Sequence, residues 1–392
     1  MLQSFPSVKE QVAAATAVLL NTFSIDPSEI RQIFMPYRIC PLGAHVDHQG
    51  GHVLGRIINT GTVLVYVPLE DPEIQLASTN FADPITFSIG AEVQPEHWAR
   101  YAQAATLALG RDYTLSRGFA GVSSGTLIGA GLSSSAAVGL AYLQALADVN
   151  NIYLSDKDLV ELDYQLEHAH LGLKNGILDQ SSILFGQKDA LVYIDTRFRQ
   201  MNLVPDPPQT GEVGWLIVHS GVNRELTKGG GYNRNVLECR EAAAWLSPEA
   251  VVLSDVPQEL FFEQAHEMPD NLRHRANHYF GEVARVSDGV QAWEENDVPG
   301  FGRLMNASCA SSIHEYGSGQ DEIIVLHQIV SEATGVYGSR FSGAGHGGVV
   351  IGLVERAHAE TAASEIMEAY REMFPALAEN AGVFLVENGF PT

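Results

Sequence analysis

Positively charged residues are scarce in this sequence. It contains 23 Lys and Arg residues against 47 Asp and Glu residues, so its formal net charge at pH 7 is −24. A field of that sign repels nucleic-acid backbones and anionic lipids, so neither nucleic acid nor a membrane is an expected partner. Anionic substrates would have to bind through local donors, helix N-termini or Mg²⁺. The sequence specifies no oligomeric state.

Cysteines and long apolar runs are also rare. Cys40, Cys239 and Cys309 lie far apart and form no CxxC pair. This argues against a disulfide framework and a thiolate metal site, and it favours a reducing cytoplasmic location. No run approaches the roughly 18 apolar residues of a membrane span. The stretch VAAATAVLL (12–20) is followed by no A-x-A site, so we expect an amphipathic helix there and not a signal peptide.

The length of 392 residues predicts two lobes, because single cores tend to stop growing at about 250–300 residues. The proline-rich segment LVPDPPQTGEVG (203–214) indicates the boundary, which divides the chain into residues 1–208 and 209–392. Hydrophobic periodicity then predicts the main elements. These are paired strands over 57–69, helices over 136–147 and 158–173, strands over 190–195 and 215–220, helices over 234–246, 320–332 and 357–371, and a strand over 347–354.

The segment LIGAGLSSSAA (127–137) joins a strand-like run to an alanine-rich helix. Gly129 and Gly131 would let the backbone approach a phosphate closely, and the N–H groups and dipole of the following helix favour an anion. The serine hydroxyls could bind phosphate or Mg²⁺. The spacing is neither that of a Walker loop nor that of a dinucleotide-binding loop. The alternative for an isolated loop of this kind is a capped helix after a flexible turn.

Two further segments are rich in side chains that can act in catalysis or in ligand binding. Glu167 and Asp179 lie twelve residues apart in EHAHLGLKNGILDQ (167–180), and two separate acids can divide metal binding and activation of a hydroxyl between them. The stretch PYRICPLGAHVDHQGG (36–51) suits a polyol pocket, in which Arg38 could lie beside Asp179 and stabilise transferred charge. The alternatives here are a turn of paired polar residues and a metal site, although the further ligands that zinc requires are missing.

Together with RFSGAGHGGVV (340–350), these segments resemble, in order, the motifs of the GHMP kinases, and among them the galactokinases. The resemblance covers residues 30–353, with Leu127 in place of the usual first proline of the phosphate loop. It implies a two-lobed α+β fold, with an N-terminal nucleotide-binding lobe similar to ribosomal protein S5 domain 2 and a C-terminal ferredoxin-like lobe. It also implies a sugar kinase that uses ATP and Mg²⁺, with the sugar in the cleft between the lobes and the 340–350 turn against the phosphate loop.

The same resemblance implies individual roles. Asp179 would be the catalytic carboxylate and Arg38 would stabilise charge, while Glu167 and a serine, Ser134 or Ser135, would hold Mg²⁺. Trp98 and Tyr101 match a W-x-x-Y motif, for which stacking on adenine and packing in the core are both open. The other expected sugar contacts are Ala44, His45, Asp47, His48, Gly176 and Tyr232, and the other expected nucleotide contacts are Gly129, Ala130, Gly131, Leu132, Ser133, Ser134 and Ser135.

Three positions depart from the galactokinase pattern. Ala44 replaces a glutamate that contacts the C6 hydroxyl, His48 replaces a tyrosine, and Cys40 replaces an asparagine. Loss of that carboxylate would admit a sugar with its own C6 carboxylate, and the 36–51 segment resembles the galacturonokinases of this branch. We therefore expect phosphorylation of the anomeric hydroxyl of D-galacturonate.

Several alternatives remain open. The carboxylate partner could be His48, Lys174 or Lys228. The substrate could instead be glucuronate, or galactose or another neutral sugar, and a galactokinase-like sugar sensor without turnover is a different class of function. A sensor should carry damage in the serine loop or at the catalytic acid, and the sequence shows none: Ser133, Ser134, Ser135, Arg38, Glu167 and Asp179 are all present.

Overall fold

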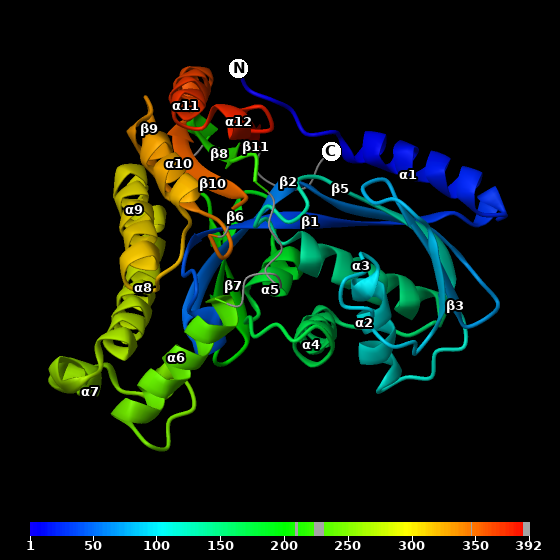
Figure 1. The fold of residues 1–392 in the computed structure, drawn as a ribbon, viewed down its shortest axis with the longest axis horizontal. Helices are drawn as coiled ribbons and strands as arrows, with labels where there is room; N and C mark the ends of the chain where they lie inside the picture. The colour runs from blue at the N-terminus through cyan, green and yellow to red at the C-terminus, as the bar shows by residue number, and fades with distance from the viewer. Residues whose placement is uncertain (208–210, 223–230, 346, 387–392) are drawn as a thin grey trace.

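A computed structural model describes residues 1–207, 211–222, 231–345 and 347–386. It contains two β-sheets with helices packed around them (Figure 1). The first sheet has the order β4-β3-β5-β2-β6-β7, with β1 paired to β2. Its strands are β1 (Arg31–Leu42), β2 (His52–Pro68), β3 (Glu73–Ser78), β4 (Ile85–Ser88), β5 (Phe119–Gly125), β6 (Ala190–Asp195) and β7 (Gln200–Pro205).

The second sheet is antiparallel, with the order β11-β8-β10-β9. Its strands are β8 (Val213–His219), β9 (Val336–Phe341), β10 (Val349–Glu355) and β11 (Gly382–Val386). In chain order this is the 4-1-3-2 arrangement of a ferredoxin-like lobe. The fold is therefore the two-lobed α+β fold that the resemblance implied, and β8 and β10 confirm the strands expected over 215–220 and 347–354.

The paired strands predicted over 57–69 are wrong, because β2 runs unbroken from His52 to Pro68. Gly61 marks a close approach and not a turn: a Cβ there would lie 2.1 Å from the Met35 carbonyl oxygen. Side chains alternate along the second half of this strand. Val63, Val65 and Val67 pack on α1 (Val8–Thr22), while Leu64 and Tyr66 belong to the main core on the other face.

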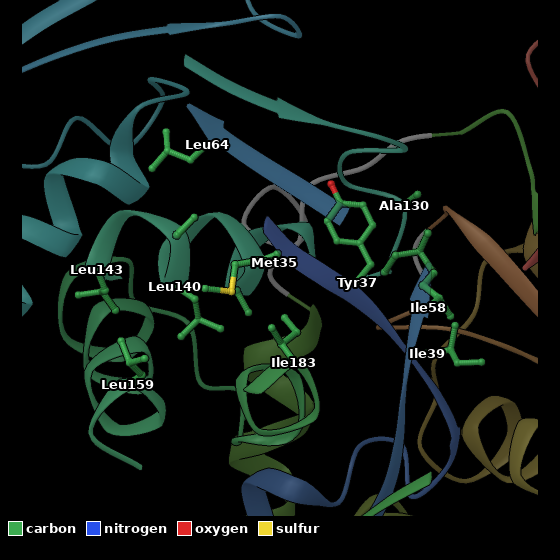
Figure 2. Close-up of a cluster of buried hydrophobic side chains, with 14 of the residues drawn as sticks. Met35, Tyr37, Ile39, Ile58, Leu64, Ala130, Leu140, Leu143, Leu159 and Ile183 are labelled. Atoms are coloured by element: carbon green, nitrogen blue, oxygen red, sulfur yellow. The ribbon is translucent and has the colours of Figure 1, made fainter. Parts of the chain in front are cut away.

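Four helices cover the face of the first sheet that lies opposite α1. They are α2 (Arg100–Gly110), α3 (Ser134–Val149), α4 (Asp156–Gln165) and α5 (Leu178–Phe185). Figure 2 shows Met35, Leu140, Leu143 and Ile183 filling the space between the β1–β2 pair and these helices. Ala130 of the phosphate loop lies near Tyr37 in the same core, so the loop rests on packed side chains.

The helix predicted over 158–173 ends earlier than expected. Helix α4 stops at Gln165, and one π-helical turn follows over Leu166–His170, so Glu167 lies in that turn. Gly172, with φ 70°, prevents further regular helix. Wider turns of this kind often occur at functional sites.

The remaining helices lie after β7. They are α6 (Gly231–Leu246), α7 (Gln258–Gln264), α8 (Asp270–Glu294), α9 (Val298–His314), α10 (Asp321–Glu332), α11 (Ala359–Met373) and α12 (Pro375–Ala378). Helices α6, α10 and α11 confirm the later predicted helices, whereas α8 and α9 were not foreseen. In the described ranges, no helix combines the length and the apolar character needed to cross a bilayer. The division of the chain near residue 208 stays a prediction.

Candidate active site

A cavity of ≈ 500 Å³ opens between the phosphate loop and the segments that face it. Gly129, Gly131 and Ser133–Ser135 line it, as do Trp98, Tyr101, Arg38 and Asp179. Ala130 and Leu132 are buried behind it. Their carbonyl oxygens accept the Val349 and Arg38 backbone N–H groups at 3.0 and 3.3 Å. These two predicted nucleotide contacts therefore fix the loop from behind, whereas the other predicted loop residues face the cavity.

The loop ends where α3 begins. Ser133 is the N-cap, in the left-handed conformation with φ 66°, and its buried Oγ has no hydrogen-bond partner among the described residues. The Ser134 hydroxyl accepts the Gly129 N–H at 3.2 Å. Because the first N–H groups of a helix lack internal partners, this end of α3 presents donors and the positive end of the dipole to the cavity.

The glycine-rich turn after β9 packs against the phosphate loop, as the resemblance implied. The Ser342 hydroxyl donates to the Gly131 carbonyl oxygen at 2.8 Å, and a Cβ on Gly131 would lie 2.4 Å from the Ser342 carbonyl oxygen. Gly131 has φ 81°. A side chain at position 131 would therefore be both strained and sterically blocked.

Gly131→Ala is expected to lower the free energy of unfolding by at least about 2 kcal/mol and to raise the KM for ATP, because strain and overlap add. Thermal unfolding and nucleotide titration measure these effects. Gly129→Ala is the matched control, since Gly129 has φ 75° but open space around the added Cβ. It should cost about 1 kcal/mol through strain alone. Equal losses in the two variants would contradict the assigned contact between the loop and the turn.

Arg38 and Asp179 meet at the inner end of the cavity. Arg38 Nε and Nη2 both donate to Asp179 Oδ1, at 2.8 and 2.5 Å, and Nη1 reaches the Ser342 hydroxyl at 3.1 Å. Burial lowers the pKa of the Arg38 guanidinium, but neighbouring charges, led by Asp179, outweigh this effect and raise it above its ordinary value. Asp179 Oδ2 forms no hydrogen bond within the described part of the chain. One oxygen is thus anchored, and the other is available to a substrate.

A second acid lies beside this pair. Burial, and then the charge of Asp179, raises the pKa of Glu167 to about 7. Its Oε2 accepts the Asn175 side-chain amide, while Oε1 has no hydrogen-bond partner in the described ranges. The Ser135 hydroxyl lies beside Glu167, and its interaction with the carboxylate opposes the rise in pKa. A buried carboxylate with an unpartnered oxygen next to a hydroxyl is suited to a hard cation.

The predicted sugar-reading turn follows β1. His45, with φ 61°, stacks on Tyr316 with ring centroids 4.3 Å apart, and Asp47 Oδ2 accepts the Leu178 N–H at 3.4 Å. Gly176 packs so closely that a Cβ there would lie 2.5 Å from the Asp47 carboxylate. Burial, and then the charge of Asp179, raises the pKa of Asp47 to about 6. The turn and the catalytic acids are therefore electrostatically linked.

Side chains of helix α8 hold the backbone of this turn. The Ala44 carbonyl oxygen accepts from His278 Nε2 at 2.9 Å, and Glu282 Oε1 accepts the Gly43 N–H at 2.8 Å. Burial lowers the pKa of His278 to about 4, so its ring is neutral near pH 7. Sequence reasoning missed both residues. Their spacing of four residues places them on one helical face, which is the signal that could have found them.

The other predicted contacts lie around these groups. The Tyr232 ring, at the start of α6, stands edge-on to His48 at 6.1 Å, and the Lys174 backbone N–H donates to Asn233. Trp98 stacks on Phe81, with centroids 5.8 Å apart, at the cavity wall, which favours a role at the cavity over burial in the core. No sequence motif indicated Phe81. Lys228 lies outside the described residues.

The fold, the glycine–serine loop and the paired acids define a kinase that phosphorylates a small molecule. The family description "GHMP kinases N terminal domain" matches residues 100–187, and "GHMP kinases C terminal" matches residues 290–372. A galacturonokinase of Arabidopsis thaliana is 38% identical over 95% of this chain and 93% of its own length. A galactokinase of Roseiflexus sp. (strain RS-1) is 33% identical over 86% of both chains.

A solved structure gives the same result. Lactococcus lactis galactokinase complexed with galactose superposes with a TM-score of 0.89 at 27% identity, over 96% of this chain and 98% of that one. The chain belongs to the galactokinase branch of the GHMP kinase family. It is an ATP-dependent sugar kinase.

Proposed function

We propose that this kinase transfers the γ-phosphoryl group of ATP to the anomeric hydroxyl of D-galacturonate. The observation that carries the proposal is Ala44, which stands where galactokinases have a glutamate. Ala44 is buried, and its carbonyl is fixed by His278, so the position is a defined part of the sugar turn. An alanine there adds no negative charge opposite a C6 carboxylate. The similarity to a galacturonokinase supports the same substrate.

In this proposal Asp179 accepts the proton of the anomeric hydroxyl. Its Oδ1 is held by two N–H groups of Arg38, which leaves Oδ2 to contact the sugar. Arg38 also contacts Ser342 and the Gly131 carbonyl, so its charge lies between the catalytic acid and the phosphate loop. There it can stabilise charge on the group being transferred. The α3 N-terminus and Ser133–Ser135 bind the nucleotide phosphates, with adenine near Trp98.

Glu167 and Ser135 are the residues that would hold Mg²⁺. The unpartnered Glu167 Oε1 and the adjacent hydroxyl fit a hard, oxygen-binding cation. When bound, Mg²⁺ neutralises charge on the phosphate oxygens. We place the reaction in the cytoplasm, since Cys40, Cys239 and Cys309 are buried free thiols.

We expect MgCl₂ to raise the Tm of the nucleotide-free protein more at pH 8 than at pH 6. The folded-state pKa of Glu167, about 7, lies above the ordinary value of 4.5 for a glutamate. The stabilising contribution of Glu167 is therefore fully present below pH 4.5. It is lost as the pH rises from 4.5 to about 7, because a buried carboxylate becomes charged. A cation would offset that charge. Thermal unfolding of Glu167→Gln should show a smaller pH-dependent loss, since Asp47 also becomes charged in this range, and no Mg²⁺ increment; a full increment in this variant would contradict the metal assignment.

An ATP-consumption assay with galacturonate, glucuronate, galactose and arabinose at equal concentrations tests the proposed substrate. Galacturonate should give the highest kcat/KM, and the product should be the 1-phosphate. Preference for galactose would favour the neutral-sugar alternative, which the similarity to galactokinases keeps as the second candidate. Binding of ATP and sugar without turnover would instead indicate a sensor.

A further inference from the structure

We propose that the hydroxyl of Tyr316 is a specificity-determining donor that binds the C6 carboxylate of the sugar. The inference rests on the proposed function. Tyr316 lies between α9 and α10, 1% exposed, and no motif pointed to it. Its ring stacks on His45, and its hydroxyl lies 3.0 Å from His48 Nε2. Ala44 belongs to the same buried cluster. The hydroxyl thus contacts the sugar turn through His48.

The hydrogen-bond network determines which atom carries each proton. Gln49 Oε1 accepts the Leu253 N–H at 3.2 Å, so the Gln49 amide nitrogen is the atom that faces His48 Nδ1, at 2.9 Å. An amide nitrogen can only donate, so Nδ1 accepts and the ring proton of neutral His48 is on Nε2. His48 Nε2–H therefore donates to the Tyr316 oxygen. Burial lowers the pKa of His48 to about 3, in agreement with a neutral ring.

Tyr316 must then direct its own O–H proton elsewhere. In the described part of the chain, its hydroxyl forms no hydrogen bond other than that with His48. A buried donor without an acceptor is costly, so the proton is available to a ligand. A glutamate at position 44, as in galactokinases, would bring an acceptor to this cluster. With Ala44 in that place, a carboxylate of the substrate can supply the acceptor.

A carboxylate satisfies this donor better than a hydroxymethyl group does. Hydrogen bonds to a charged acceptor are shorter and roughly twice as strong as neutral ones. A neutral phenol also avoids the desolvation cost of burying a lysine or arginine. Tyr316 thus distinguishes a uronate from a neutral sugar at C6, and the chain from Gln49 through His48 fixes the direction in which it donates.

Tyr316→Phe removes one oxygen atom and tests the proposal. The expected result is a loss of about 10- to 100-fold in kcat/KM for galacturonate, mainly through KM, with less than about threefold change for galactose and for the KM of ATP. Tyr370→Phe is the matched control, because Tyr370 is also buried and donates its hydroxyl to the Ser220 carbonyl at 2.8 Å. It should change neither sugar's kinetics.

A second variant leaves Tyr316 in place. Gln49→Glu replaces the donor to His48 Nδ1 with an acceptor, which moves the ring proton to Nδ1 and turns Nε2 into an acceptor of the Tyr316 proton. The same selective loss for galacturonate is expected, and it does not depend on folding of the Phe variant.

The outcomes separate the two proposals. Suppose that the wild-type enzyme prefers galacturonate, but that both variants lower kcat/KM equally for the two sugars or lower it for neither sugar. The role of Tyr316 is then wrong, and the proposed function stands. If the wild-type enzyme prefers galactose, the proposed function is wrong, and the proposed contact between Tyr316 and a C6 carboxylate is wrong as well.

Discussion

Replacing Asp179 with asparagine is expected to lower kcat by about 10³-fold, because an amide cannot accept the sugar proton. Asp179 Oδ1 is anchored by Arg38, and Oδ2 is the remaining acceptor at the cavity. Since Asp179 is assigned to the sugar and not to the nucleotide, the affinity for ATP should change by less than about threefold. Steady-state kinetics and nucleotide titration measure the two quantities.

Asp206→Asn provides a matched control. Asp206 forms a buried ion pair with Arg56, at 2.5 Å, in which both side chains are at most 5% exposed. Its loss should lower the Tm as the loss of a buried pair does, while kcat per folded molecule stays near the wild-type value. Residual turnover above roughly a tenth in Asp179→Asn would exclude Asp179 as the base, because the loss of a general base costs about 10²- to 10⁴-fold.

The second large effect is expected for Ala44→Glu. A carboxylate placed about 4 Å from the C6 carboxylate would repel it by several kcal/mol at the effective dielectric constant of a protein surface. We expect kcat/KM for galacturonate to fall by about 100-fold and the value for galactose to rise. The same four-sugar assay measures the change in preference.

Ala44→Gln separates charge from size. Glutamine has nearly the volume of glutamate without its charge, so it should lower kcat/KM for galacturonate far less than glutamate does. Equal losses with the two residues would show that the position acts by steric exclusion. The loss would then say nothing about a carboxylate on the substrate.

The sequence predicted the parts of the site that are local in the chain. The phosphate loop and the Glu167–Asp179 segment are contiguous, so their residue types and spacing indicate their chemistry directly. The 340–350 turn could be placed against the loop because the resemblance supplied that pairing, and Ser342 and Gly131 confirm it. Strand β2 was misread because Gly61 indicates a break, whereas it permits close contact with Met35.

What the sequence could not predict depends on long-range contacts. His278 and Glu282 sit in a 25-residue helix that also carries many exposed polar residues, so the helical face that they share is only a weak local signal. Their role appears only when α8 is placed against the Gly43–Ala44 backbone, more than 200 positions earlier. Tyr316 and Phe81 are further cases, because an isolated aromatic residue is most often a core residue.

Glu282 has one more consequence. The carboxylate that holds Gly43 also lies 3.6 Å from Arg340, a fully buried guanidinium at the end of β9. Two residues further on, Ser342 contacts both Arg38 and the phosphate loop. The sugar turn, through Glu282, and the phosphate loop, through Ser342, are thus both tied to the end of β9. We therefore expect that a sugar bound at the turn favours the ordered phosphate loop, and that bound ATP favours the ordered turn. By thermodynamic reciprocity, ATP and sugar should then tighten the binding of each other to the same extent.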